Sequence, residues 1–206
     1  MTTVTNMIPL RERKKAETKK RIVAAAMKIF AKKGIEAATV DEIAAAAEVG
    51  KGTIYNYFET KEDIIVAFLV DIENDVQAEV TKMIKRPRSL QAALTQYVLF
   101  QFKLKEPHHE FVQVFLAQMF SKASAASPWI QQIQTIIDPP LRVLFSSLQH
   151  RGLVRADIDV SVLIQLFKVV HLGLTALWTI EGPPWSGTET VVRQEIRLFC
   201  EGVGAT

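Results

Sequence analysis

The stretch TVDEIAAAAEVGKGTIYNYFETK, residues 39–61, decides the fold of this chain. Thr39 is followed three residues later by Glu42, which is the spacing of a capping box at the start of a helix. The pattern predicts a short helix over residues 40–47, a tight turn, and a second short helix over residues 51–58. The stretch therefore predicts two short helices that pack against each other across a turn.

The apolar and polar positions of this stretch separate into two sets. The positions expected to face the other helices are apolar: Ile43, Ala44, Ala47, Val49, Ile54 and Phe58. The remaining positions carry groups that suit a DNA surface: Lys51, Gly52, Thr53, Tyr55, Asn56 and Tyr57. Hydroxyls and ammonium groups bind phosphates, and an Asn amide binds the edge of a base. A purely structural alternative places the aromatic residues in the core; we accept it for Phe58 and for part of each Tyr ring.

The rest of the chain predicts only helices. A helix over residues 15–33 precedes the motif and ends at Gly34, and Thr60 opens a long helix after it. Further helices are expected over these ranges: 61–85, 89–105, 108–122, 127–150, 159–181 and 188–201. Asp138-Pro139-Pro140 is expected to kink or split one of them. The fold class is all-α with about nine helices, divided into a flexible basic tail (1–14), a three-helix head (15–60) and a larger helical body (61–206).

Charge is distributed unevenly along the chain. The net charge is +3, but residues 10–33 hold ten basic and two acidic side chains, whereas residues 62–206 hold 13 basic and 15 acidic ones. A basic head on a near-neutral body is typical of a protein that contacts a polyanion at one end. A basic helix face that is merely solvated has the same pattern, so charge alone leaves both readings open.

Several function classes find no support in the sequence. Cys200 is the sole cysteine and the four histidines are dispersed, so no disulfide, metal site or cofactor is expected. No nucleophile and base stand at a usable spacing, and the string Gly50-Lys51-Gly52-Thr53 lacks the leading Gly and the strand of a phosphate-binding loop. We expect no enzyme. We also expect no membrane span and no secretory signal, which favours the cytoplasm.

The motif as a whole resembles the tetracycline-repressor (TetR) family. The likeness rests on residues 38–44 and 49–63 and on the preceding Phe-Ala-Lys-Lys-Gly, residues 30–34, and covers the remainder only by architecture. It implies a homodimer that binds double-stranded operator DNA, with a recognition helix at Lys51–Tyr57. The positions that match the family's DNA contacts are Thr39, Lys51, Gly52, Thr53, Tyr55, Asn56, Tyr57 and Lys61. The sequence departs from the common pattern at Glu48, where a positive φ is expected, and at Gly50, a slightly poorer N-cap.

The body offers candidates for a ligand pocket and for a dimer face. Bulky residues that could line an apolar pocket are Phe100, Phe111, Phe115, Met119, Trp129, Phe167, His171 and Trp178. Polar candidates for orienting a ligand are Gln96, Gln113, Gln118, Gln165 and His171, while His108 and His109 are expected to be solvated. The helix over residues 159–181 is apolar nearly all round and must be covered on two sides. By analogy with the family, the last two helices are expected to dimerise through Val162, Leu166, Val169, Val192, Ile196 and Phe199.

These observations favour a repressor that an unknown small apolar or amphipathic effector releases from a palindromic operator. The alternative is a ligand-independent DNA-binding or protein-interaction module whose body has a filled core. The two differ in whether the body contains a connected cavity.

Overall fold

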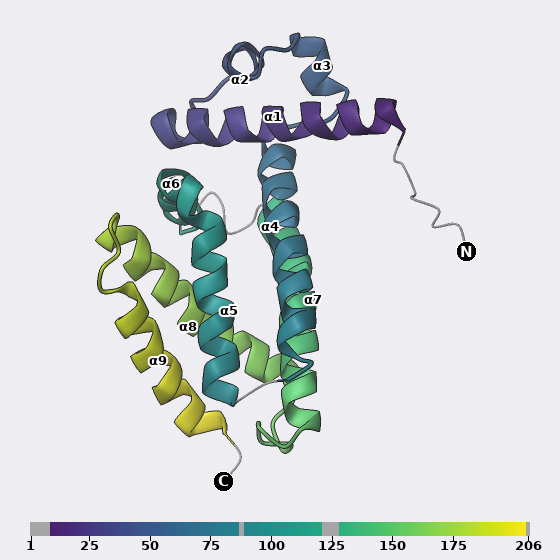
Figure 1. Cartoon of the computed structure of the whole chain (residues 1–206). Coiled ribbons are helices and arrows are strands. Elements are labelled where there is room, and N and C mark those ends of the chain that lie inside the picture. Colours follow the sequence, from purple (N-terminus) through teal and green to yellow (C-terminus); the bar gives the residue numbers. More distant parts are fainter. Residues whose placement is uncertain (1–8, 87–88, 121–127, 205–206) are drawn as a thin grey trace, which may run out of the picture. The chain divides into compact units, whose positions relative to one another are not determined.

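The computed structural model describes residues 9–86, 89–120 and 128–204 of the chain. Within these ranges all regular secondary structure is helical, which confirms the all-α fold class. The helices, labelled in Figure 1, are α1 (Leu10–Lys33), α2 (Val40–Ala46), α3 (Lys51–Tyr55), α4 (Lys61–Met83), α5 (Leu90–Lys105), the 3-10 helix η1 (Glu106–His108), α6 (His109–Met119), α7 (Pro128–His150), α8 (Val160–Glu181) and α9 (Thr188–Val203).

The chain forms two compact units, Met1–Ala67 and Phe68–Thr206. The boundary falls inside α4, so this helix contributes its first two turns to the first unit and the rest to the second. Three predictions about the helices were wrong. α1 begins at Leu10, five residues earlier than expected and inside the predicted flexible tail, and α3 ends at Tyr55, three residues earlier than expected. α7 continues through Pro139 and Pro140 without a split.

The first unit is built around the apolar face of α1. Ile22 and Phe30 are fully buried, and α2 packs against α1 while α3 packs against α2. Figure 1 shows α2 and α3 on the same side of α1. Ile43 and Ile54 bring the inner faces of the two short helices into this core, where they are at most 1% exposed. A five-residue helix such as α3 is not stable alone, so its position depends on this packing.

Both expected features of the turn region are present. The Thr39 hydroxyl accepts a hydrogen bond from the Glu42 N–H at 3.3 Å, and the Glu42 carboxylate accepts one from the Thr39 N–H at 3.1 Å, which completes the capping box. Glu48 has φ of 53°, in the left-handed region that glycine favours. The N–H of Val49 then bonds to the carbonyl of Ala44 at 3.0 Å, which closes the turn.

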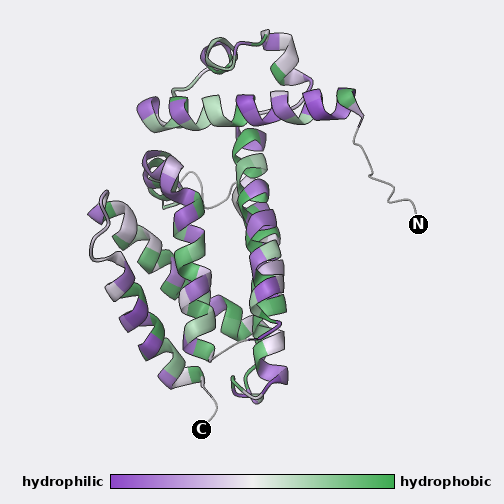
Figure 2. Cartoon of the chain, in the orientation of Figure 1, coloured by the Kyte–Doolittle hydropathy of each residue, from purple (hydrophilic) through white to green (hydrophobic). Residues whose placement is uncertain are grey.

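The second unit packs its helices around buried aromatic rings. α8 contacts α6, α7 and α9, and α5 contacts α9. The Phe167 ring lies at the centre, with ring centroids of Tyr97, Phe145 and Phe199 at 5.7, 5.5 and 5.6 Å. In Figure 2, α9 alternates between hydrophilic and hydrophobic positions, as a helix with one covered face should.

The apolar character of α8 exceeds what the sequence analysis anticipated. An 18-residue window of Val160–Glu181 has a mean hydropathy of 1.8, so this helix meets the length and composition criteria for a membrane span. Only 33% of that window is buried within the chain. Because α8 packs against α6, α7 and α9 on one side, its remaining apolar surface lies on the outside of the unit.

Replacing Glu48 with glycine should stabilise the protein. A non-glycine residue in the left-handed region costs roughly 1–2 kcal/mol of stability. Glycine removes this strain, but its greater conformational entropy in the unfolded chain offsets about half of the stability gained. We expect Glu48→Gly to raise the free energy of unfolding by about 0.5–1 kcal/mol in urea titrations. Ala37→Gly, at an exposed loop position with negative φ, should lower it. A loss of stability in Glu48→Gly would show that the positive φ of Glu48 does not strain the backbone.

Candidate functional site

The outer face of α3 is polar and open. Ile54 and Phe58 are buried, whereas Lys51, Gly52, Tyr55 and Asn56 are exposed. Tyr55 is 51% exposed although its ring is large enough to fill a core site. A Cβ atom added at Gly52 would meet nothing within 4 Å, so the backbone there is accessible. This face therefore presents an ammonium, a phenol, an amide and bare backbone to solvent.

Ion pairs tie α2 to its neighbours at the edge of this face. The Lys51 ammonium donates to the Asp41 carboxylate at 2.8 Å, and this hydrogen bond raises the pKa of Lys51. Lys33 pairs with Glu42, whose pKa is lowered chiefly by that bond. Both partners of the Lys51–Asp41 pair are at least half exposed, so Lys51 can exchange its carboxylate for another anion at little cost.

Lys61 has a different environment from the other expected contacts. Its ammonium donates to three backbone carbonyls, Ile35 at 2.8 Å, Glu36 at 2.8 Å and Ala38 at 2.9 Å. An ammonium has three N–H donors, and all three are used here. Lys61 therefore holds the segment between α1 and α2 against the start of α4.

The second unit contains a cavity of about 140 Å³ between α4, α5, α6, α7 and α8. Apolar side chains form most of its wall: Phe68, Leu69, Phe111, Val112, Phe115, Leu116, Met119, Ile133, Ile137 and Leu172. The rings of Phe68 and Phe111 meet edge to face with centroids 5.5 Å apart. The polar members of the wall are Glu73, Lys105, Lys168, His171 and Thr175.

The polar wall groups have shifted proton affinities. Burial raises the pKa of Glu73, although the charge of Lys105 and a hydrogen bond from Gln101 act in the opposite direction. Burial lowers the pKa of Lys105 to about 8, opposed by Glu73. Burial also holds the pKa of His171 well below its usual value, with Lys105 adding to the effect. Shifts of this kind, gathered in one apolar cavity, are typical of a binding site.

A stripe of exposed apolar side chains runs along α8. Val162 is 53% exposed, Leu166 47% and Val169 69%, and the stripe continues through Leu177 at 52% and Ile180 at 77%. The spacing of three or four residues keeps these positions on one helix face. On α9, Val191 and Leu198 are also exposed, at 37% and 49%. Exposed apolar surface of this extent is typical of interaction sites.

Comparison with known proteins agrees with the motif. A family model described as bacterial regulatory proteins, tetR family, matches residues 22–68. The transcriptional repressor KstR2 of Mycolicibacterium smegmatis is 24% identical over 191 residues, which are 91% of this chain and 91% of that protein. The transcriptional regulator SrpR of Pseudomonas putida is 24% identical over 161 residues, 77% of this chain and 73% of that protein.

Over residues 22–68 the chain matches the TetR family of bacterial regulatory proteins, and the relatives and solved structures support a TetR-family transcriptional regulator. It is a DNA-binding transcriptional regulator and not an enzyme. Solved structures share its fold. The fatty acid degradation regulator FadR of Bacillus halodurans has a TM-score of 0.75 at 20% identity and covers 90% of this chain and 95% of its own. FadR of Bacillus subtilis, in complex with stearoyl-CoA, has a TM-score of 0.73 at 21% identity, with coverage of 89% and 98%.

The structure exposes five of the eight residues predicted from the TetR resemblance to contact DNA. Thr39, Lys51, Gly52, Tyr55 and Asn56 are exposed. Thr53 and Tyr57 are half-buried, with the Tyr57 ring 6.3 Å from that of Phe58. Lys61 is half-buried, and its bonds to three backbone carbonyls use all three of its N–H donors. These carbonyls come from residues more than twenty positions earlier, so sequence spacing could not reveal them.

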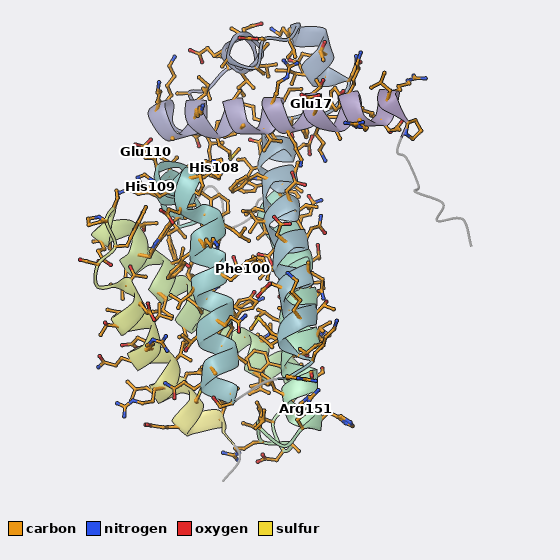
Figure 3. All side chains as sticks on the ribbon, viewed as in Figure 1. Glu17, Phe100, His108, His109, Glu110 and Arg151 are labelled. Atoms are coloured by element: carbon orange, nitrogen blue, oxygen red, sulfur yellow. The ribbon has the colours of Figure 1, made fainter. Side chains whose placement is uncertain are left out.

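Four of the eight predicted pocket residues line the cavity: Phe111, Phe115, Met119 and His171. The other four do not. Phe100 lines a separate open groove of about 770 Å³ and is labelled between α5 and α4 in Figure 3. Trp129 contacts the Phe115 ring at 6.0 Å, Phe167 fills the core, and Trp178 stacks between Phe102 and Trp185.

Among the predicted polar pocket residues, only His171 belongs to the cavity wall. Gln96, Gln113 and Gln165 are exposed, and Gln118 is half-buried outside the cavity. His108 and His109, at the start of α6 in Figure 3, are not simply solvated: their rings meet Phe68 at 5.0 Å and Trp185 at 5.4 Å.

Three charged residues of the cavity wall were not predicted from the sequence: Glu73, Lys105 and Lys168. Glu73 carried a usable signal, because it is a lone acid among the buried positions of α4: Ile65, Leu69, Ile72, Val76 and Val80. Nothing in the sequence places Lys105 near Glu73.

The residues predicted for a dimer face differ in exposure between the two helices: those on α8 are exposed, whereas those on α9 are buried. Val162, Leu166 and Val169 are exposed, but Val192 and Ile196 are at most 1% exposed and Phe199 is 8% exposed. These three side chains fill the core of their own chain, where Phe199 meets Phe145 and Phe167. Periodicity identified the apolar face of α9 but not the molecule that covers it.

Removing the Lys61 ammonium should destabilise the first unit. Lys61→Met leaves three carbonyls without their donor, two of them in part-buried bonds, and we expect a loss of about 2 kcal/mol in the free energy of unfolding. Thermal and urea unfolding of the full chain measure it. Lys28→Met, at an exposed position of α1, should change stability little. A variant that keeps full stability but binds DNA weakly would restore Lys61 as a direct contact.

Proposed function

We propose that the chain is a homodimeric repressor that binds a palindromic operator through α3 and is released when a small ligand occupies the cavity of the second unit. The polar outward face of α3 is the observation that supports DNA binding in this proposal. The buried side chains of Ile54 and Phe58 fix the position of α3, while those of Lys51, Tyr55 and Asn56 lie outside the core. Two such helices about one DNA turn apart, roughly 34 Å, would read two half-sites.

The exposed stripe on α8, with Val191 and Leu198 of α9, supports the dimer. The stripe consists of Val162, Leu166, Val169, Gly173, Leu177 and Ile180, all exposed in the single chain. A two-fold axis places the same patch of each copy against the other, so one apolar stripe covers both. Val191 also lines an apolar hollow with Leu177 and Ile180, where side chains of a second copy could seat.

The cavity supports ligand control over the alternative of a filled core. A volume of about 140 Å³ remains between the helices, and buried polar atoms in its wall have no partner among the described residues. α4 contributes Ile64 and Ile65 to the first unit and Glu73 to the cavity wall, so a single helix belongs to both units. The FadR structure from Bacillus subtilis contains stearoyl-CoA, which supports ligand binding by this fold. The cavity here is smaller than the roughly 300–1,000 Å³ of most ligand pockets.

The direct test is selection of operator DNA from random sequences by the full-length protein. We expect enrichment of one short palindrome, bound with two chains per site. Recovery of no preferred sequence by a properly folded protein would refute the proposed function.

Two substitutions on α3 should separate base reading from phosphate binding. Asn56→Ala should relax discrimination at one position of each half-site, at a cost of about 1–3 kcal/mol for the preferred base. Lys51→Ala should weaken binding to all sequences alike and reduce the slope of affinity against salt by about one per chain. Lys103→Ala, an exposed lysine of the second unit, is the control. Equal effects of the two α3 variants on all sequences would contradict the division of roles.

A charge in the α8 stripe should separate the dimer. Leu166→Glu places two carboxylates near the two-fold axis, and we expect the dimer dissociation constant to rise about 100-fold or more. Analytical ultracentrifugation measures it, and operator affinity should fall in parallel. Val143→Glu replaces an exposed apolar residue of α7, outside the stripe, and should leave the dimer intact. An unchanged dimer in Leu166→Glu would place the interface elsewhere.

A further inference from the structure

The cavity wall contains polar atoms whose hydrogen bonds are incomplete. Gln101 donates to one carboxylate oxygen of Glu73 at 3.0 Å and to the Tyr97 hydroxyl at 3.1 Å. The second carboxylate oxygen of Glu73, Oε2, has no partner among the described residues, and neither does Nε2 of His171. Glu73 is only 7% exposed. Buried polar atoms are nearly always paired, so a group outside the described chain is expected to complete them.

The volume of the cavity limits the size of that group. At about 140 Å³ it is close to the roughly 150 Å³ of an apolar engineered cavity in another protein that accommodates one benzene molecule. Three phenylalanines, Phe68, Phe111 and Phe115, supply aromatic wall, with successive ring centroids 5.5 and 5.9 Å apart. Aromatic rings pack well against one another edge to face or offset. A ligand of one ring therefore fits the space without movement of the helices.

The charges of the wall limit the ligand's head group. Lys168 is committed to Asp138 at 2.8 Å, which leaves Glu73 and Lys105 as the charges that face a ligand. The lowered pKa of His171 keeps its ring neutral at pH 7, and Lys105, with a pKa of about 8, stays mostly protonated. Gln101 donates a hydrogen bond to Glu73 and the Lys105 charge favours its ionised form, so the wall presents one carboxylate beside one ammonium. A ligand with a net charge of either sign would leave an unbalanced charge in a buried site, which is costly.

A hydroxyl group satisfies both charges at once. Its O–H donates to Oε2 of Glu73, and its oxygen accepts from Lys105 or from an N–H of His171. We propose that the effector is an uncharged compound of about one ring that bears a hydroxyl group, a simple phenol, held between Glu73 and Lys105 with its ring among the three phenylalanines. This inference rests on the proposed function, because it assigns a chemical class to the ligand of that cavity.

Four probes of matched size test the proposal on the full-length protein. They are p-cresol, toluene, benzoate and benzylamine, with binding measured by calorimetry and by tryptophan fluorescence, because the Trp129 ring lies 6.0 Å from that of Phe115 in the cavity wall. We expect p-cresol to bind about 10- to 100-fold more tightly than toluene, the range that one hydrogen bond to a buried charged group contributes. Benzoate and benzylamine should both bind more weakly than p-cresol.

Charge substitutions should redirect this preference. Glu73→Gln removes the carboxylate and leaves Lys105, so benzoate should gain at least about tenfold in affinity. Lys105→Met leaves Glu73, so benzylamine should gain instead. A misfolded variant cannot produce either gain. Glu79→Gln, on the same helix but outside the cavity, should keep the order of the four probes unchanged.

Several results would overturn the proposal. Equal affinity for toluene and p-cresol, an unchanged order of probes in both charge variants, or no binding of any probe to the wild-type protein would each do so. Operator selection with the same preparation separates this failure from that of the proposed function. A protein that selects a palindrome but binds no probe retains the DNA-binding role and loses the phenol, whereas a protein that selects no DNA loses the proposed function whatever it binds.

Discussion

The burial of one face of α3 is the constraint on which the surface proposed to bind DNA depends. Five residues cannot sustain a helix in water, so α3 exists because Ile54, together with Phe58 just after it, is held in the core of the first unit. Once these two side chains are buried, the orientation of the other side chains of α3 is fixed. Tyr55 and Asn56 must point outward because the side chains beside them point inward. The same packing that forms the helix thus determines which of its side chains are exposed to solvent.

The turn before α3 shows how local sequence and tertiary packing divide this task. Thr39 and Glu42 form a capping box that is encoded within four residues, and this feature was fully predictable. The positive φ of Glu48 was predictable for the same reason, since a tight turn after a helix requires it. Lys61 was not predictable, because its three acceptors are carbonyls of residues 35, 36 and 38, which acquire meaning only when the chain has folded back.

The second unit marks the limit of periodicity as a guide. The sequence correctly indicated that α8 is apolar on two faces, and the structure buries Phe167 on one while exposing Leu166 on the other. For α9 the same reasoning selected Ile196, which is buried in its own chain, and passed over Leu198. An apolar stripe on a helix must be buried against another surface. The sequence pattern of the stripe is the same whether that surface belongs to the same chain or to a second copy. The packing of α9 on α5 and α8 shows that its apolar stripe is buried within its own chain.

The cavity shows why polar residues in a core carry more information about function than apolar ones. Phenylalanines such as Phe111 and Phe115 occur in filled cores as well as in pocket walls, so their positions in the sequence do not distinguish a pocket from a packed core. Glu73 differs, because an acid on the buried face of α4 costs stability unless its charge and both oxygens are compensated. Gln101 and Lys105 compensate it in part, and one oxygen remains unpaired. A ligand that completes this arrangement binds the state that presents it, and a state with a displaced Glu73 binds that ligand less well. Such a difference in affinity is the physical requirement for a ligand to shift a protein between two states. Glu73 lies on the same helix, α4, as Ile64 and Ile65, which are fully buried in the first unit.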